Sequence, residues 1–144
     1  MAIDTSVYER QRRGITDDYA TRAATNAYSR FLSQQRSERG LADYQRDFRR
    51  QTPRFTASYA RRGMAGGGVR SGVYNQAMRN YVGDYGQNLN RMYADQASEL
   101  RQFDLTAAEQ AAAKDRALAD VEMDKQREIA NAALYLTALK PSFT

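Results

Sequence analysis

The sequence predicts an all-α protein in which two elongated helical arms are joined by a glycine-rich loop. Five of the nine glycines fall within residues 61–72, and a helix does not survive such a run because each internal glycine costs about 1 kcal/mol relative to alanine. Apolar side chains recur at helical spacing on both sides of the loop, and no strand pattern is present. We expect a basic helical N-terminal arm over residues 1–62, a hinge loop over 63–72 and a long helical C-terminal arm over 73–144, forming one structural unit.

The hinge loop depends on residues that can adopt positive φ angles and allow close backbone approach. The predicted hinge residues are Gly63, Gly66, Gly67, Gly68 and Gly72. Part of the spacing is that of a phosphate-binding loop, but Val69 stands where such a loop requires lysine, and the segment lies between two helices. We therefore interpret the loop as structural and expect no nucleotide cofactor.

In the N-terminal arm we expect a polar lead-in over residues 1–15 and then three helices, over about 17–39, 41–51 and 53–62. Thr16 can cap the first helix, and Gly40 is suited to end it. Pro53 is tolerated at the first position of a helix but not inside one, where it costs roughly 3 kcal/mol. These three residues therefore predict two breaks before the loop.

The C-terminal arm has a broad apolar face at helical spacing after the loop, with Gly83 and Gly86 interrupting it. Thr106 and Glu109 have capping-box spacing, so a helix restarts there or runs straight through. The last segment, from 107 to 140, is rich in alanine and contains no glycine. We predict a long C-terminal helix that ends at Pro141.

The composition predicts a thin core. Leu, Ile, Val and Phe number 22 of 144 residues, below the roughly 20 percent at which disorder becomes a concern, while 23 alanines and ten tyrosines supply other contact surface. We infer that much of the burial comes from other chains, as in a homo-oligomer. No apolar run reaches the roughly 20 residues of a membrane helix, and the N-terminus lacks the pattern of a signal peptide. We therefore expect a soluble protein made in the cytoplasm.

The absence of cysteine and histidine removes thiolate nucleophiles, Cys/His zinc sites and histidine acid–base catalysis. Asp17 and Asp18 are adjacent and point to different sides of a helix, and Asp120 and Asp124 lie near a lysine with no further ligand. We interpret these carboxylates as solvated helix faces. The sequence predicts no enzyme, no metal site and no cofactor.

Two sets of residues are predicted to make contacts with other molecules. The apolar and aromatic set, expected to pack as helix–helix interfaces, is Tyr44, Phe48, Phe55, Tyr59, Tyr74, Tyr81, Tyr85, Leu89, Phe103, Leu118, Val121, Ile129 and Leu136. The charged set, expected to pair with carboxylates, is Arg46, Arg49, Arg50, Arg54, Arg61, Arg62 and Arg70. Residues 1–70 hold 14 Lys/Arg against 7 Asp/Glu, whereas residues 71–144 hold 8 against 10. The alternative for the basic half is nucleic acid, because arginines interleaved with aromatic rings suit single strands.

The segment from Tyr59 to Met78 resembles small helical virion proteins of tailed bacteriophages, especially those that infect actinobacteria. Such proteins carry Arg-Gly-(Leu/Met)-x-x-x-Gly-x-x-Ser-Gly between helices rich in Ala, Gln, Arg and Tyr, and the match covers Arg62 to Ser71, with a looser match over the C-terminal helix ending Ala-Leu-Lys-Pro. The resemblance implies a minor structural component of the virion, commonly of the tail, with no catalytic residues. The first 40 residues lie outside it.

We therefore expect a non-enzymatic minor tail protein, located in the virion, that packs in multiple copies and against other virion proteins. The alternative is a DNA-associated virion or ejection protein that binds nucleic acid through its basic half.

Overall fold

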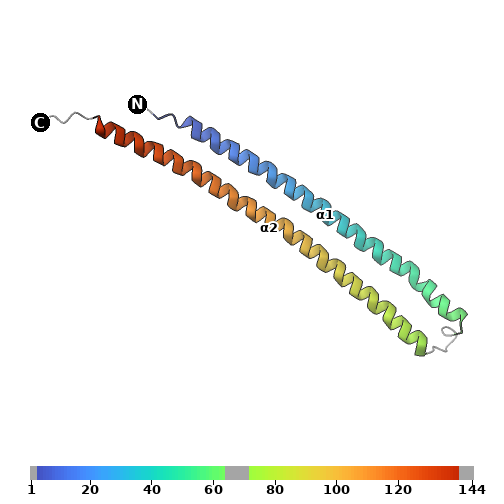
Figure 1. Cartoon of the computed structure of the whole chain (residues 1–144). Coiled ribbons are helices and arrows are strands. Elements are labelled where there is room, and N and C mark those ends of the chain that lie inside the picture. The colour runs from blue at the N-terminus through green and yellow to red at the C-terminus, as the bar shows by residue number, and fades with distance from the viewer. Residues whose placement is uncertain (1–2, 64–71, 140–144) are drawn as a thin grey trace. The chain divides into compact units, whose positions relative to one another are not determined.

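The computed structural model describes residues 3–63 and 72–139, and these residues form two helices and no strand (Figure 1). Helix α1 is Ser6–Arg61 and helix α2 is Gly72–Ala138. The two long helices pack against each other, which confirms the predicted all-α class and its two helical arms.

The prediction of a lead-in and three separate helices before the loop is wrong. Helix α1 begins ten residues before Thr16 and runs without a break through Gly14, Gly40 and Pro53. Glycine and proline lower helix propensity by only about 1 and 3 kcal/mol, and packing against a second helix outweighs costs of that size because most helical stability in proteins comes from tertiary contacts.

Helix α2 also continues through its predicted weak points. It begins at Gly72, passes Gly83 and Gly86, and runs straight through Thr106, so the capping-box spacing does not mark a restart. Its last helical residue is Ala138. The predicted stop at Pro141 lies outside the described residues.

The start of α1 is held by a side-chain cap. Asp4 Oδ1 accepts a hydrogen bond from the backbone N–H of Ser6 at 2.9 Å, one of the N–H groups at a helix start that lack a partner within the helix. Two hydrogen bonds hold the pKa of the Asp4 carboxyl below its ordinary value. The larger effect comes from the Ser6 hydroxyl and the smaller from the Ser6 backbone N–H. Ionised Asp4 also suits the positive end of the helix dipole.

The chain forms two compact units, and each unit takes one segment from each helix. The terminal unit is Met1–Tyr28 with Phe103–Thr144, and the loop-proximal unit is Ser29–Gln102. The units therefore cut across the two predicted arms, since each contains part of both.

In the loop-proximal unit the less exposed positions recur in steps of four, four and three residues. On α1 they include Ser33, Ser37, Leu41, Tyr44, Phe48, Thr52, Phe55 and Tyr59, and on α2 Tyr74, Met78, Tyr81, Tyr85, Leu89, Met92, Gln96 and Leu100. This spacing corresponds to about 3.67 residues per turn, close to the 3.6 of an ideal helix. Each stripe therefore stays on the side of its helix that faces the other helix.

In the terminal unit the two helix segments meet through polar groups as well as apolar ones. Val121 is buried. The Asn26 side-chain amide donates to the backbone carbonyl of Phe103 at 3.0 Å, and the Tyr8 hydroxyl donates to the Glu128 carboxylate. Early residues of α1 thus lie beside late residues of α2, so the two segments are antiparallel.

Two glycine-to-alanine substitutions are expected to have opposite effects on stability. A Cβ at Gly40 would meet only the Met92 methyl group at 4.0 Å, which is ordinary contact, whereas Gly63 has φ of 72°. We expect Gly40→Ala to raise the free energy of unfolding by about 1 kcal/mol through helix propensity, and Gly63→Ala to lower it by about 1–2 kcal/mol through left-handed strain. Urea titrations followed by circular dichroism measure both, and effects of the same sign would contradict the prediction.

Candidate functional site

Seven aromatic side chains of the loop-proximal unit pack together in an aromatic seam. It consists of Tyr44, Phe48, Phe55 and Tyr59 from α1 with Tyr74, Tyr81 and Tyr85 from α2. These are seven of the thirteen residues predicted as interfaces. The partner of this stripe is the chain's own second helix.

Rings from the two helices alternate along the seam. The ring of Tyr85 lies between those of Tyr44 and Phe48, with centroid distances of 5.2 and 3.8 Å and interplanar angles of 14° and 17°. The ring of Tyr81 lies between those of Phe48 and Phe55, at 5.1 and 4.5 Å and at 19° and 8°. Since aromatic pairs contribute about 0.5–1.5 kcal/mol beyond their buried area, we expect this stack to stabilise the unit.

The seam changes geometry toward the loop. The rings of Tyr59 and Tyr74 meet edge to face, with centroids 5.6 Å apart and planes at 65°. The Tyr74 and Tyr81 hydroxyls lie 3.4 and 3.5 Å from the Oγ1 atoms of Thr56 and Thr52, respectively. Tyr74 is buried, so these threonines provide its end of the seam with a polar neighbour.

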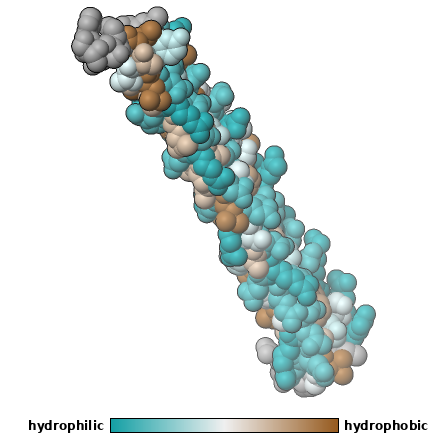
Figure 2. Space-filling view, turned by 60° about the vertical axis from the view of Figure 1, so that its left-hand side comes forward, coloured by the Kyte–Doolittle hydropathy of each residue, from teal (hydrophilic) through white to brown (hydrophobic). Residues whose placement is uncertain are grey.

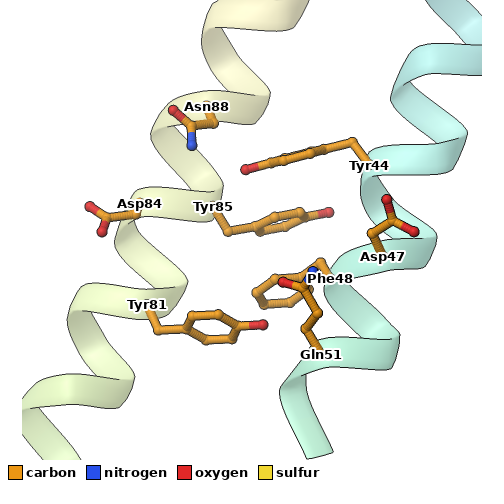
Figure 3. A pocket seen from close by; sticks show the side chains of 8 residues that line it. All are labelled: Tyr44, Asp47, Phe48, Gln51, Tyr81, Asp84, Tyr85 and Asn88. Atoms are coloured by element: carbon orange, nitrogen blue, oxygen red, sulfur yellow. The ribbon is translucent and has the colours of Figure 1, made fainter. Parts of the chain in front are cut away.

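A groove of about 310 Å³ runs along one side of the seam (Figure 3). It is lined by Tyr44, Asp47, Phe48, Gln51, Tyr81, Asp84, Tyr85 and Asn88. Figure 3 shows the rings stacked on one another across the groove, with the Asp84 carboxylate directed away from them. Because the rings of Tyr85, Phe48 and Tyr81 are stacked between neighbouring rings, the groove offers ring edges together with exposed polar side chains.

Of the predicted arginines that the structure describes, five lie on α1 and Arg62 follows its last residue. Arg46, Arg49, Arg50, Arg54, Arg61 and Arg62 are all exposed, and Arg70 lies outside the described residues. Arg46 pairs with Asp43 on the same helix at 2.7 Å, and the Arg62 guanidinium lies 5.9 Å from the centre of the Tyr59 ring. These contacts hold two of the arginines close to their own helix and leave their charge in solvent.

Charge is divided unequally between the two units. The described residues of the loop-proximal unit include 12 arginines against 6 Asp/Glu, whereas those of the terminal unit include 8 Lys/Arg against 11 Asp/Glu. The basic character predicted for the first half of the chain thus belongs to the loop-proximal unit. The terminal unit carries a net negative charge.

The remaining predicted interface residues differ in burial. Leu89, Phe103 and Leu118 are half-buried, Val121 is buried, and Ile129 and Leu136 are exposed near the end of α2. Figure 2 shows a group of apolar residues at the upper end of the molecule. The end of α2 is therefore the part of the predicted set that has the least cover from its own chain.

The sequence did not identify several residues that hold the helices together. Leu41 and Ser33 are buried, and neither is among the predicted interface residues. Asn26 and Tyr8 make contacts with residues 77 and 120 positions away. No local signal could have revealed those pairs, because they depend on how the two helices are aligned.

Of the hinge glycines, the structure describes Gly63 and Gly72. Gly63 has the positive φ expected of a turn residue, and Gly72 is the first residue of α2. Gly66, Gly67 and Gly68 lie outside the described residues, so their predicted role as a hinge stays a prediction.

No protein-family model matches the sequence, and no curated protein or solved structure is significantly similar to it. In the described parts of the chain, neither helix has a stretch long and apolar enough to span a membrane. Residues 3–63 and 72–139 also contain no cluster of three or more His, Cys, Asp or Glu side chains that could hold a metal ion. The fold defines an all-α protein of two long, packed helices.

Proposed function

We propose that the chain is a non-enzymatic structural component of a tailed-bacteriophage virion, a minor tail protein that packs in several copies and against other virion proteins. The observation that supports it most is the small core. Among the described hydrophobic residues only Leu41, Tyr74 and Val121 are buried, with 7–9 % of their surface exposed, and none of the described side chains is fully buried. Helices with so little internal burial gain stability when neighbouring molecules cover them.

The resemblance of the segment around Gly63 to phage virion proteins is the second support. It bears on the class of protein and on its location in the virion, and it implies no catalytic residue. The mechanism that follows is assembly, in which repeated copies present the same surfaces to one another.

The contacts between copies do not need the aromatic seam, because its rings already pack within the chain. The exposed arginines of the loop-proximal unit and the carboxylates of the terminal unit are complementary surfaces for neighbouring copies. Arginine is suited to such contacts because its guanidinium binds carboxylates in bidentate geometry.

Analytical ultracentrifugation of the full chain tests the proposal. We expect concentration-dependent association in about 50 mM NaCl, weaker in about 0.5 M NaCl, because salt screens contacts between exposed charges. A chain that stays monomeric and melts cooperatively under both conditions would contradict it. Imaging of particles that contain the protein would then test its location.

The second candidate function is binding of virion DNA, and the surplus of six arginines in the described loop-proximal unit favours it. Stacking of bases on the seam would require the rings to separate, so phosphate contacts are the feasible mode. Filter binding at two salt concentrations separates the candidates, because release of counterions gives DNA binding a steep salt dependence. Binding of DNA without self-association would favour this candidate over the first.

A further inference from the structure

The face by which α2 contacts α1 continues beyond the start of α1. In the terminal unit this face includes Val121, half-buried Lys125, Glu128 at the Tyr8 hydroxyl, and half-buried Ala132. Helix α1 begins at Ser6, only two residues before Tyr8. The same face of α2 reaches Tyr135 and Leu139 at the next helical steps, beyond the residues that α1 covers.

A groove of about 570 Å³ lies at this end of the terminal unit. Ile3 and Asp4 form one wall, and the other is formed by Glu128, Asn131, Ala132, Tyr135 and Leu136 of α2 with Leu139 just after it. Tyr135 is 73 % exposed and Leu136 53 % exposed. The groove therefore extends an interface that the chain already uses, and beyond Asp4, Glu128 and Asn131 its lining is apolar.

The chemistry of the segment restricts what can cover it. No charged residue occurs between Glu128 and Lys140, so residues 129–139 present only uncharged side chains. Next to them, residues 3–13 and 122–128 hold five Lys/Arg and five Asp/Glu. Because these neighbouring charges are equal in number, an anionic surface would gain no net attraction from them. A second uncharged helix can pack on the segment without charge repulsion.

We propose that residues 129–139 of two copies of this chain pack antiparallel on each other. The end of α2 in each copy then covers the part of the other copy's α2 that lies beyond the start of α1. The contact is isologous: the same face serves both molecules, and the two-helix packing continues from one into the other. The inference rests on the proposed self-association of the chain and names one surface that carries it. About three turns of helix is a small interface, so the dimer is weak and reversible.

Sedimentation equilibrium of the full chain in about 0.5 M NaCl tests the proposal, because contacts between exposed charges are then screened while burial of apolar surface is not. We expect a monomer–dimer equilibrium for the wild type and at least a tenfold weaker dimer for Leu136→Asp. Leu105→Asp is the matched control, since Leu105 is also an exposed leucine of α2 (58 %) and should leave the dimer unchanged. Circular dichroism checks that both variants remain helical.

The chain has no cysteine, so a single Tyr135→Cys or Leu136→Cys substitution, each near the middle of residues 129–139, gives a second readout. Oxidation should link two copies through at least one of these positions, and a cysteine at Leu105 should give no link. Equal dimerisation of wild type and Leu136→Asp would overturn the end contact while leaving self-association in place. Association only at low salt would also overturn the end contact and leave self-association in place. A monomer at both salt concentrations would overturn the proposed assembly as well. Binding of the wild type to phosphatidylcholine vesicles that Leu136→Asp abolishes would also overturn the end contact, because it would make lipid the occupant.

Discussion

Replacing Phe48 by alanine is expected to lower the free energy of unfolding of the loop-proximal unit by about 2–3 kcal/mol. A fully buried phenylalanine costs about 3–5 kcal/mol when truncated, and Phe48 is half-buried, which places the effect below that range. Its ring stacks on two partners, Tyr85 at 3.8 Å and Tyr81 at 5.1 Å. Truncation removes both contacts and breaks the alternation of rings, so the loss of stability exceeds what the lost buried area alone would give.

The matched control is Phe31→Ala, which makes the same substitution on the same helix and in the same unit. Phe31 is 53 % exposed, and we expect its loss to cost less than about 1 kcal/mol, since surface substitutions away from specific contacts have small effects. Hydrogen exchange with mass spectrometry resolves the two units, and urea titration gives the free energy. Equal costs for Phe48→Ala and Phe31→Ala would mean that the seam does not stabilise the unit.

A double substitution tests whether the rings act together. Tyr85 stacks on Phe48 directly, so Phe48→Ala and Tyr85→Ala combined should cost less than the sum of the single changes, by about 0.5–1.5 kcal/mol. Additive costs would show that each ring contributes only through its own burial.

The spacing of the aromatic residues on α1 indicated a single stripe, which was expected to pack on another molecule. Tyr44, Phe48, Phe55 and Tyr59 lie on one face if the chain bends little near Thr52, and α1 does continue through that point. What the sequence could not give is the partner. The same stripe suits a helix of another chain or of its own, and only the alignment of α1 with α2 distinguishes them.

The glycines show why helix boundaries were harder to predict than helices. Gly63 ends its helix with a positive φ, while Gly40 lies inside one, half-buried against Met92. Both look alike as local signals, because glycine is compatible with either role. The difference comes from contacts with α2, which offset the low helix propensity of glycine at Gly40. Those contacts depend on residues about 50 positions away.

Proline 53 presents the same conflict in a stronger form, and its replacement gives the second large effect. Pro53 is exposed and lies inside α1, where it removes one backbone hydrogen bond and brings its ring against the carbonyl of Arg49, at a cost of roughly 3 kcal/mol. Alanine would restore the N–H without loss of packing. Because the unfolded chain also gains freedom when proline is removed, by about 0.4–1 kcal/mol, we expect Pro53→Ala to raise the free energy of unfolding by about 1–2 kcal/mol.

Pro53→Gly serves as the control, because it removes the same ring but lacks the helix propensity of alanine. We expect it to be about 1 kcal/mol less stable than Pro53→Ala. The aromatic contacts on the two sides of Pro53 make the opposite result informative. Phe48 packs on Tyr85 and Phe55 packs on Tyr81. If Pro53→Ala destabilised the unit, the local geometry at the proline would be what aligns both ring pairs. The helix would then depend on a residue that helix propensity disfavours.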